Sequence, residues 1–192
     1  LSSTPEDRRE LMDLVERMQS AFTTIAKSKV PTIALAHGFC IGGATSLVSA
    51  CDIRLATKDA KFSIGETKLG LVADVGVIQR MPKIVSSGDM NELALTGRIF
   101  DGEHEEKIRF VRKVYENSDD LFEAGEKLAN EISSNSKRIV QATKEALEKS
   151  SNLTVDQGLE YAKLWSTSFL VSEDLREGVM AFLEKRDPKF NE

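Results

Sequence analysis

Residues 61–80 read KFSIGETKLGLVADVGVIQR, and this stretch places two carboxylates, Glu66 and Asp74, among apolar residues and glycines. A carboxylate in such surroundings is either desolvated, which favours its protonated form, or paired with a group distant in sequence. Two separated carboxylates suit the removal and delivery of protons. Acids near glycine also often do no more than cap helices, and the spacing alone leaves both interpretations open.

A strand, a tight turn and a helix are predicted immediately upstream. Residues 32–36 form a short apolar run between a proline and a glycine, and residues 43–50 contain the small side chains of a closely packed helix. Gly42 and Gly43 then stand at the helix N-terminus, where free backbone N–H groups can hold an anion or a developing oxyanion. By itself a glycine pair is weak evidence for such a site, because most turns of this kind serve only close packing.

Helical periodicity dominates the rest of the chain. Thr4, Pro5 and Asp7 predict a capped start for an amphipathic helix that continues to about Ile25. We expect Arg80 to pair with an acid such as Asp52 or Glu92. Beyond it, the pattern predicts a helix over 84–96, a short charged helix and a strand within 110–115. Three or four amphipathic helices follow from residue 119, one capped by Thr154 with Gln157 and the last beginning at Ser172.

Composition excludes several classes of function. The chain has 26 Lys and Arg against 31 Asp and Glu, a net charge of −5, so nucleic acid is not an expected partner. No apolar segment is long enough to span a bilayer. Cys40 and Cys51 are expected to be reduced thiols, and His37 with Cys40 lacks the further ligands that a metal site needs. We therefore expect no bound metal.

Ordered motifs across the chain resemble the crotonase family, also called the enoyl-CoA hydratase/isomerase family. They are VP at 30–31, HG at 37–38, IGG at 41–43, ACDIR at 50–54, AKF at 60–62, Glu66, LGL at 69–71, QR at 79–80, LTGR at 95–98, EDLREG at 173–178 and FLEKR at 182–186. The resemblance implies an α/β fold, with a crotonase-like spiral (ββα) core over 1–133 that is N-terminally incomplete, followed by a C-terminal α-helical oligomerisation region over 134–192. It also implies a homotrimer, often stacked as a hexamer. Family members usually carry glycine where Arg109 stands.

The segment Ala73-Asp74-Val75-Gly76 resembles the dienoyl-CoA isomerase branch, which moves two double bonds from the 3,5 to the 2,4 positions in fatty-acid β-oxidation. This resemblance implies an acyl-CoA substrate, no separate cofactor, Glu66 and Asp74 as the acid/base pair, and the Gly43 N–H in an oxyanion hole. Gly42 and Ser46 are expected to contact the substrate. Hydratases, and usually this branch too, have an acid at the Ser46 position.

Chemistry independently favours two carboxylates for such a shift. One proton leaves the carbon next to the thioester and another arrives four bonds further along, which is too far for one short side chain to serve both. The alternatives are an enoyl-CoA hydratase or 3,2-enoyl-CoA isomerase, in which Glu66 acts largely alone, and a catalytically silent crotonase-fold scaffold.

Compartment is not decided by any residue. Proteins of this resemblance work in mitochondria or peroxisomes in eukaryotes and in the cytoplasm in bacteria. The C-terminal KFNE is not a peroxisomal Ser-Lys-Leu address.

Overall fold

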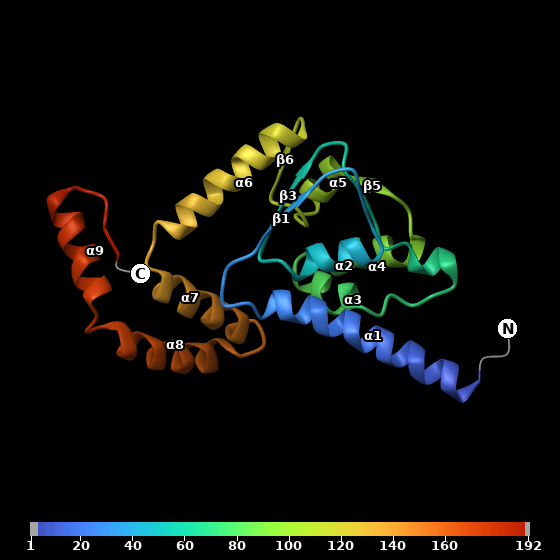
Figure 1. Cartoon of the computed structure of the whole chain (residues 1–192), viewed down its shortest axis with the longest axis horizontal. Helices are drawn as coiled ribbons and strands as arrows, with labels where there is room; N and C mark the ends of the chain where they lie inside the picture. The colour runs from blue at the N-terminus through green and yellow to red at the C-terminus, as the bar shows by residue number, and fades with distance from the viewer. Residues whose placement is uncertain (1–3, 191–192) are drawn as a thin grey trace. The chain divides into compact units, whose positions relative to one another are not determined.

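The chain separates into two units in the computed structural model, which describes residues 4–190 (Figure 1). One unit contains the residues up to Ser28 together with Thr32–Gly125, and the other contains Lys29–Pro31 together with the residues from Glu126 onward. The predicted division between residues 133 and 134 falls at the end of α6 (Ser118–Ser133) and stays a prediction.

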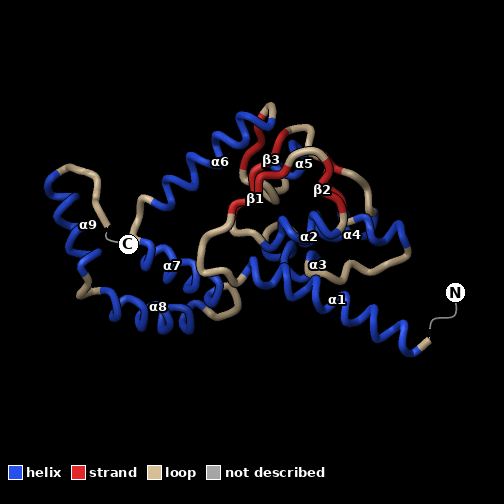
Figure 2. Tube along the Cα trace, in the orientation of Figure 1, coloured by secondary structure: helices blue, strands red, loops and turns tan. Residues whose placement is uncertain are grey.

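Two three-stranded sheets form the centre of the first unit (Figure 2). One has the order β1-β3-β6 and is parallel, and the other has the order β2-β4-β5, with β2 parallel and β5 antiparallel to β4. The strands are β1 (Ile33–Ala36), β2 (Phe39–Ile41), β3 (Ile53–Thr57), β4 (Lys61–Ser63), β5 (Phe100–Asp101) and β6 (Lys113–Tyr115). Strands β1 and β2 belong to different sheets and are followed by α2, after which β3 pairs with β1 and β4 pairs with β2. The predicted α/β spiral of ββα turns is therefore confirmed.

Helices of the first unit agree closely with the local sequence signals. Its helices are α1 (Pro5–Ala26), α2 (Gly43–Ala50), α3 (Val77–Arg80), α4 (Ser87–Thr96) and α5 (Gly102–Lys107), with 3₁₀ turns η1 (Gly65–Leu69) and η2 (Met81–Lys83). The predicted cap at Thr4 is confirmed and is a full capping box: the Thr4 side chain accepts a hydrogen bond from the Asp7 N–H while the Asp7 carboxylate accepts one from the Thr4 N–H. The predicted bounds of α2 are also confirmed.

Aromatic and aliphatic side chains fill the space between these elements. Phe62 and Phe110 are fully buried and meet edge to face, with ring centroids 5.9 Å apart. Met81 and Leu93 are buried in the same core. Phe62, the middle residue of β4, thus packs that strand into the core of the first unit.

Arg109 occupies a backbone conformation that favours glycine, with φ of 66°. The Phe110 N–H donates to the Glu105 carbonyl and the Arg109 N–H to the Glu106 carbonyl, which is a Schellman ending for α5. The strand that follows, β6, is shorter than the predicted run over 110–115. Arg109 therefore adopts a left-handed backbone conformation that costs more free energy for arginine than for glycine.

The second unit contains the end of α6 and a helical hairpin in which α7 (Lys137–Ser150) packs on α8 (Val155–Phe169), and α9 (Glu173–Glu184) follows. Thr154 and Gln157 form the predicted capping box of α8, and the Ser172 side chain caps α9 as predicted. Within residues 4–190, no helix is long and apolar enough to cross a membrane.

Glu105 is a buried acid in the first unit. Its side chain on α5 is 2% exposed, and its Oε2 atom has no hydrogen-bond partner in the part of the chain that the structure describes. Burial, followed by the negative charges of Asp101 and Asp89, raises the pKa of Glu105 to about 8. The folded chain therefore holds this proton at pH values where the unfolded chain releases it.

Stability is consequently expected to fall as the pH rises from about 5 to 8, because the folded-state pKa lies above the unfolded one. This single proton contributes a slope approaching about −1.4 kcal/mol per pH unit to the free energy of unfolding. Urea titrations across this range should show the slope in the parent chain and its loss in Glu105→Gln. Glu103→Gln, an exposed change on the same helix, should keep the slope. Equal slopes in the parent and Glu105→Gln would contradict the assignment.

Candidate active site

Parallel pairing of β2 with β4 places two predicted site elements at one edge of their sheet. Phe39 lies opposite Lys61 and Ile41 lies opposite Ser63. The chain leaves β2 through Gly42 into α2, and it leaves β4 through Ile64 into η1, which carries Glu66. Because the carboxyl ends of parallel strands meet at the same edge, the glycine turn and Glu66 are brought together.

The N-terminus of α2 is fixed on the ends of both strands. Gly42 has φ of 59° and donates its N–H to the Ser63 carbonyl at 2.9 Å. The Thr45 hydroxyl lies 2.5 Å from the Cys40 carbonyl oxygen and 3.1 Å from that of Ser63. Among residues 4–190 no side chain caps this helix, and Gly43 is exposed. The first-turn N–H groups are therefore suited to an anion or an oxyanion.

Glu66 lies against this turn. A methyl group added at Gly42 would lie 3.4 Å from Glu66 Oε1, so the carboxylate fills the space beside the glycine. The other oxygen, Oε2, is buried and has no hydrogen-bond partner within residues 4–190. The Thr67 hydroxyl donates to the Ala94 carbonyl at 2.6 Å and holds η1 on α4. A buried acceptor beside a helix N-terminus can accept a proton from a bound substrate.

Ser46 lies one turn further along α2, and its N–H donates to the Gly42 carbonyl. Its side chain is fully buried, and its hydroxyl oxygen has no partner in the described part of the chain. Residues four apart on a helix share a face, which puts Ser46 on the side of α2 that carries Gly42. The predicted contact of Ser46 with substrate stays a prediction.

Asp74 differs from Glu66 in its surroundings. It lies on the segment 70–76, called here the Asp74 loop, which connects η1 to α3. The side chain of Asp74 is exposed, whereas Ala73 and Val75 on either side of it are buried. Helix α3, which begins directly after this loop, packs against α2. Neither η1 nor α3 has a side-chain cap within residues 4–190, so the capping role considered for Glu66 and Asp74 is not observed.

Contacts from α1 to the Asp74 loop were missed by the sequence analysis. The Gln19 side-chain amide donates to the Asp74 carbonyl at 2.6 Å. Arg80 donates to the Thr23 hydroxyl and to the Val75 carbonyl, instead of pairing with Asp52 or Glu92. Gln19 and Thr23 are four residues apart on α1, and that polar pair at helical spacing is the signal that could have indicated them.

The metal-like spacing of His37 and Cys40 is not completed by other ligands, since residues 4–190 contain no group of three side chains suited to a metal ion. Cys40 and Cys51 do not form a disulfide, and Cys40 is buried whereas Cys51 is half-buried. Burial raises the pKa of the Cys40 thiol to about 12, so this sulfur is a poor nucleophile at neutral pH.

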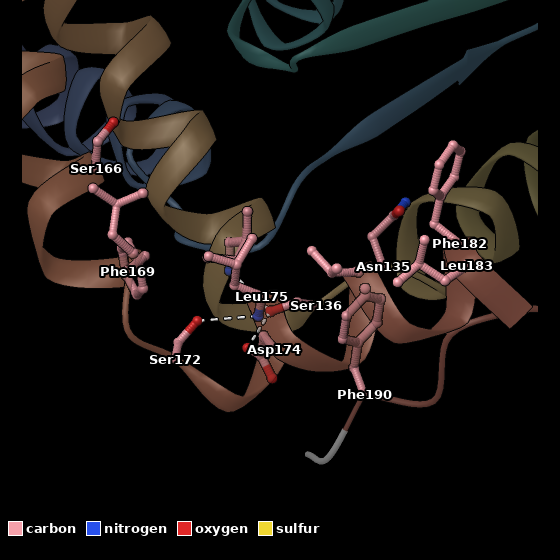
Figure 3. Close-up of a pocket in the computed structure, with 14 residues that line it drawn as sticks. Asn135, Ser136, Ser166, Phe169, Ser172, Asp174, Leu175, Phe182, Leu183 and Phe190 are labelled. Atoms are coloured by element: carbon pink, nitrogen blue, oxygen red, sulfur yellow. Dashed lines mark hydrogen bonds between the residues drawn. The ribbon is translucent and has the colours of Figure 1, made fainter.

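A separate cavity of about 530 Å³ lies within the second unit (Figure 3). The Ser136 hydroxyl donates to the Asp174 carboxylate at 2.6 Å at its wall and thereby links the start of α7 to the start of α9. The rest of the lining is mainly apolar, with Ile139, Phe169, Leu175, Phe182, Leu183 and Phe190 among its residues. Such walls suit an apolar group and not proton transfer.

Comparison with known proteins gives one consistent family. Residues 5–192 match the family described as Enoyl-CoA hydratase/isomerase. The mitochondrial Delta(3,5)-Delta(2,4)-dienoyl-CoA isomerase of Dictyostelium discoideum is 46% identical over 188 residues, which are 98% of this chain and 64% of that protein. The peroxisomal Delta(3,5)-Delta(2,4)-dienoyl-CoA isomerase of Arabidopsis thaliana is 40% identical over 193 residues, 98% of this chain and 69% of that protein. The chain thus spans less than two thirds of the first of these relatives.

Solved structures show the same fold. An enoyl-CoA hydratase from Bacillus anthracis superposes with a TM-score of 0.89 at 27% identity, covering 98% of this chain and 72% of that one. A probable enoyl-CoA hydratase/isomerase from Mycobacterium abscessus superposes with a TM-score of 0.91 at 24% identity, with coverage of 98% and 72%. The predicted crotonase-type fold is therefore confirmed.

The two glycines at the start of α2 should respond differently to substitution. Gly42→Ala forces a side chain into the left-handed region, and we expect it to lower the free energy of unfolding by roughly 1–2 kcal/mol. Gly43→Ala is the matched control, because a methyl group there meets no atom within 4 Å, and its effect should stay within about 1 kcal/mol. Urea denaturation of both variants measures the difference. Equal destabilisation would contradict the conformation described for Gly42.

Proposed function

The chain belongs to the enoyl-CoA hydratase/isomerase family, and from this premise we propose that its protein converts a 3,5-dienoyl-CoA to the 2,4-dienoyl-CoA in fatty-acid β-oxidation. The observation that carries the proposal is the combination of Glu66 against the Gly42 turn with a second carboxylate, Asp74, on the loop that precedes α3. The names of the relatives from Dictyostelium and Arabidopsis support it. They also support a mitochondrial or peroxisomal location.

The proposed reaction is a proton transfer without net loss or gain of atoms. A proton leaves C2, next to the thioester carbonyl, and its electron pair is delocalised onto the carbonyl oxygen on one side and through the two double bonds to C4 and C6 on the other. Protonation at C6 then gives double bonds at C2 and C4. Because C2 and C6 are four bonds apart, one acid/base group at each end satisfies the geometry better than a single carboxylate.

Each proposed site residue has a chemical role in this scheme. Glu66 and Asp74 remove and deliver the two protons, and which of them serves C2 is left to experiment. The exposed Gly43 N–H at the start of α2 donates to the developing enolate oxygen. One donor of this type typically contributes about 3 kcal/mol to transition-state stabilisation. Gly42 and Ser46 shape the substrate side of the turn.

No separate cofactor is needed for this chemistry. Moving the double bonds leaves the oxidation level of the acyl chain unchanged, so no electron acceptor or donor enters the balance. Coenzyme A belongs to the substrate. An enolate held by backbone N–H groups also has its charge stabilised without a metal ion.

A hydratase is the second candidate, because a probable enoyl-CoA hydratase of Mycobacterium leprae is 34% identical over 171 residues, 89% of this chain and 66% of that protein. Activation of a water molecule for hydration uses two carboxylates at the α2 end of the site. The neutral, buried Ser46 supplies none on that helix, which argues against a normal hydratase. The same residue is the reason to keep a catalytically silent scaffold as a third outcome.

The test measures isomerisation of a 3,5-dienoyl-CoA by ultraviolet absorbance in the full-length protein. Asp74→Asn and Glu66→Gln should each lower kcat by about 10²-fold or more, because each removes one proton-transfer group. Asp13→Asn, which changes an exposed acid on α1, should leave kcat unchanged.

Other results would overturn the proposal. Hydration of a 2-enoyl-CoA without isomerisation of the dienoyl substrate would identify a hydratase and leave Asp74 without a catalytic role. Inactivity of the parent protein on both substrates would identify a scaffold.

We also propose that the second unit joins copies of this chain in a trimer or a hexamer. Helix α9 exposes large apolar side chains on more than one face, including Val179, Phe182 and Leu183, of which Phe182 is 83% exposed. Exposed apolar surface of this kind is typical of an interface between chains.

Light scattering of the full-length protein tests this assembly. The parent should have a mass of three or six chains, and Phe182→Glu with Leu183→Glu should reduce it to one chain because two charges would be buried in the interface. Lys163→Gln, a change in an exposed ion pair on α8, should leave the mass unchanged. A monomeric parent would refute the assembly.

A further inference from the structure

We propose that Gln19 of α1 is a positioning residue for Asp74, and that it sets the rate of proton transfer by fixing the backbone of the Asp74 loop. This inference rests on the proposed function, in which Asp74 transfers a proton. It assigns a role to α1, which carries neither Glu66 nor Asp74.

The contact acts directly on the catalytic position. The Gln19 amide nitrogen lies 2.6 Å from the carbonyl oxygen of Asp74, 55 residues away in sequence. The bond is to the main chain of Asp74 and leaves its carboxylate free to face solvent or substrate. We therefore expect loss of this bond to displace the carboxylate without changing its chemical identity.

Arg80 provides a second tie between α1 and the same loop. Its guanidinium donates to the Thr23 hydroxyl at 3.0 Å and to the Val75 carbonyl at 3.3 Å. The guanidinium also fills the space beside Gly76, where an added methyl group would lie 1.9 Å from Nη1. Arg80 thus links Val75 and Gly76, the two residues after Asp74, to Thr23 on α1.

Burial explains why ties to the main chain are needed. Ala73 and Val75 are buried and anchor their side chains in the core, whereas Asp74 between them is exposed. The preceding residues give no such anchor, since Leu71 is 60% and Val72 is 77% exposed. The Gln19 bond therefore restrains the main chain at Asp74, whose own side chain is not held by packing.

Helix α1 is suited to positioning because it reaches this loop through the Gln19 hydrogen bond and, by way of Arg80, through Thr23. None of its described residues is buried, and Gln19 lies on its exposed surface. Removal of the Gln19 amide should consequently leave the folded core intact. A displacement of about 1 Å at a proton-transfer group can lower the rate by up to 10²-fold.

The experiment compares Gln19→Met with Thr24→Ala in the full-length protein. Methionine keeps the length and the helix propensity of glutamine but cannot donate a hydrogen bond. Thr24→Ala is the matched control, because the Thr24 hydroxyl donates to the Ser20 carbonyl within α1. Gln19→Met should lower kcat for dienoyl-CoA isomerisation about tenfold with KM changed less than about twofold, whereas Thr24→Ala should change neither.

A double-mutant cycle with Asp74→Asn shows whether Gln19 acts through Asp74. In the Asp74→Asn background, Gln19→Met should cause no further loss, since the group that it positions is already absent. Thr23→Val, which removes the acceptor for Arg80 and preserves side-chain shape, should lower kcat in the same direction as Gln19→Met. Melting temperatures of all variants identify any that fail to fold.

Failure of this inference is distinguishable from failure of the proposed function. If Asp74→Asn abolishes isomerisation but Gln19→Met has no effect, Gln19 is not a positioning residue and the proposed function stands. Independent, multiplicative losses in the double variant would also overturn the inference, because Gln19 would then act elsewhere. If Asp74→Asn leaves isomerisation unchanged, Asp74 transfers no proton, so this inference and the proposed role of Asp74 both fall while the isomerase activity itself stands.

Discussion

Parallel pairing between β2 and β4 is the constraint on which the candidate site depends. These strands are only three residues long, yet their register sets Ile41 opposite Ser63 and so fixes where α2 and η1 begin. Phe62, fully buried in the core, prevents a slip of β4 by one residue, which would expose it. The contact between Glu66 and the Gly42 turn follows from this register and needs no ion pair to form.

The two carboxylates are held in different ways, and the difference follows from their elements. Glu66 is on a short 3₁₀ turn that is bonded to α4, and one of its oxygens is buried without a partner among residues 4–190. An unsatisfied buried acceptor costs about 1–3 kcal/mol, so its retention favours a functional explanation. Asp74 has a solvated side chain and a restrained main chain. A site with one half-buried and one exposed acid offers two separate groups for proton removal and delivery.

Local signals explain how much could be predicted from the sequence. The caps at Thr4 and Thr154 and the bounds of α2 depend on residues within one helical turn, and the motif order was sufficient to indicate the spiral. Partners distant in sequence were not predictable in this way. Arg80 bonds to Thr23 and Val75 and not to an acid, and Glu105 is buried within a stretch so charged that its sequence favours exposure. Both depend on packing between elements that no short pattern specifies.

Different interactions stabilise the core of the first unit and position the Asp74 loop. The core of the first unit is held by buried apolar side chains such as Phe62, Phe110 and Met81, whereas the Asp74 loop is joined to α1 by hydrogen bonds near solvent. One such bond contributes only about 1 kcal/mol to net stability, because water competes for the same groups. Its directionality nonetheless restrains where the Asp74 carbonyl lies. The loop can therefore be adjusted for chemistry through α1 while the sheets and their register stay unchanged.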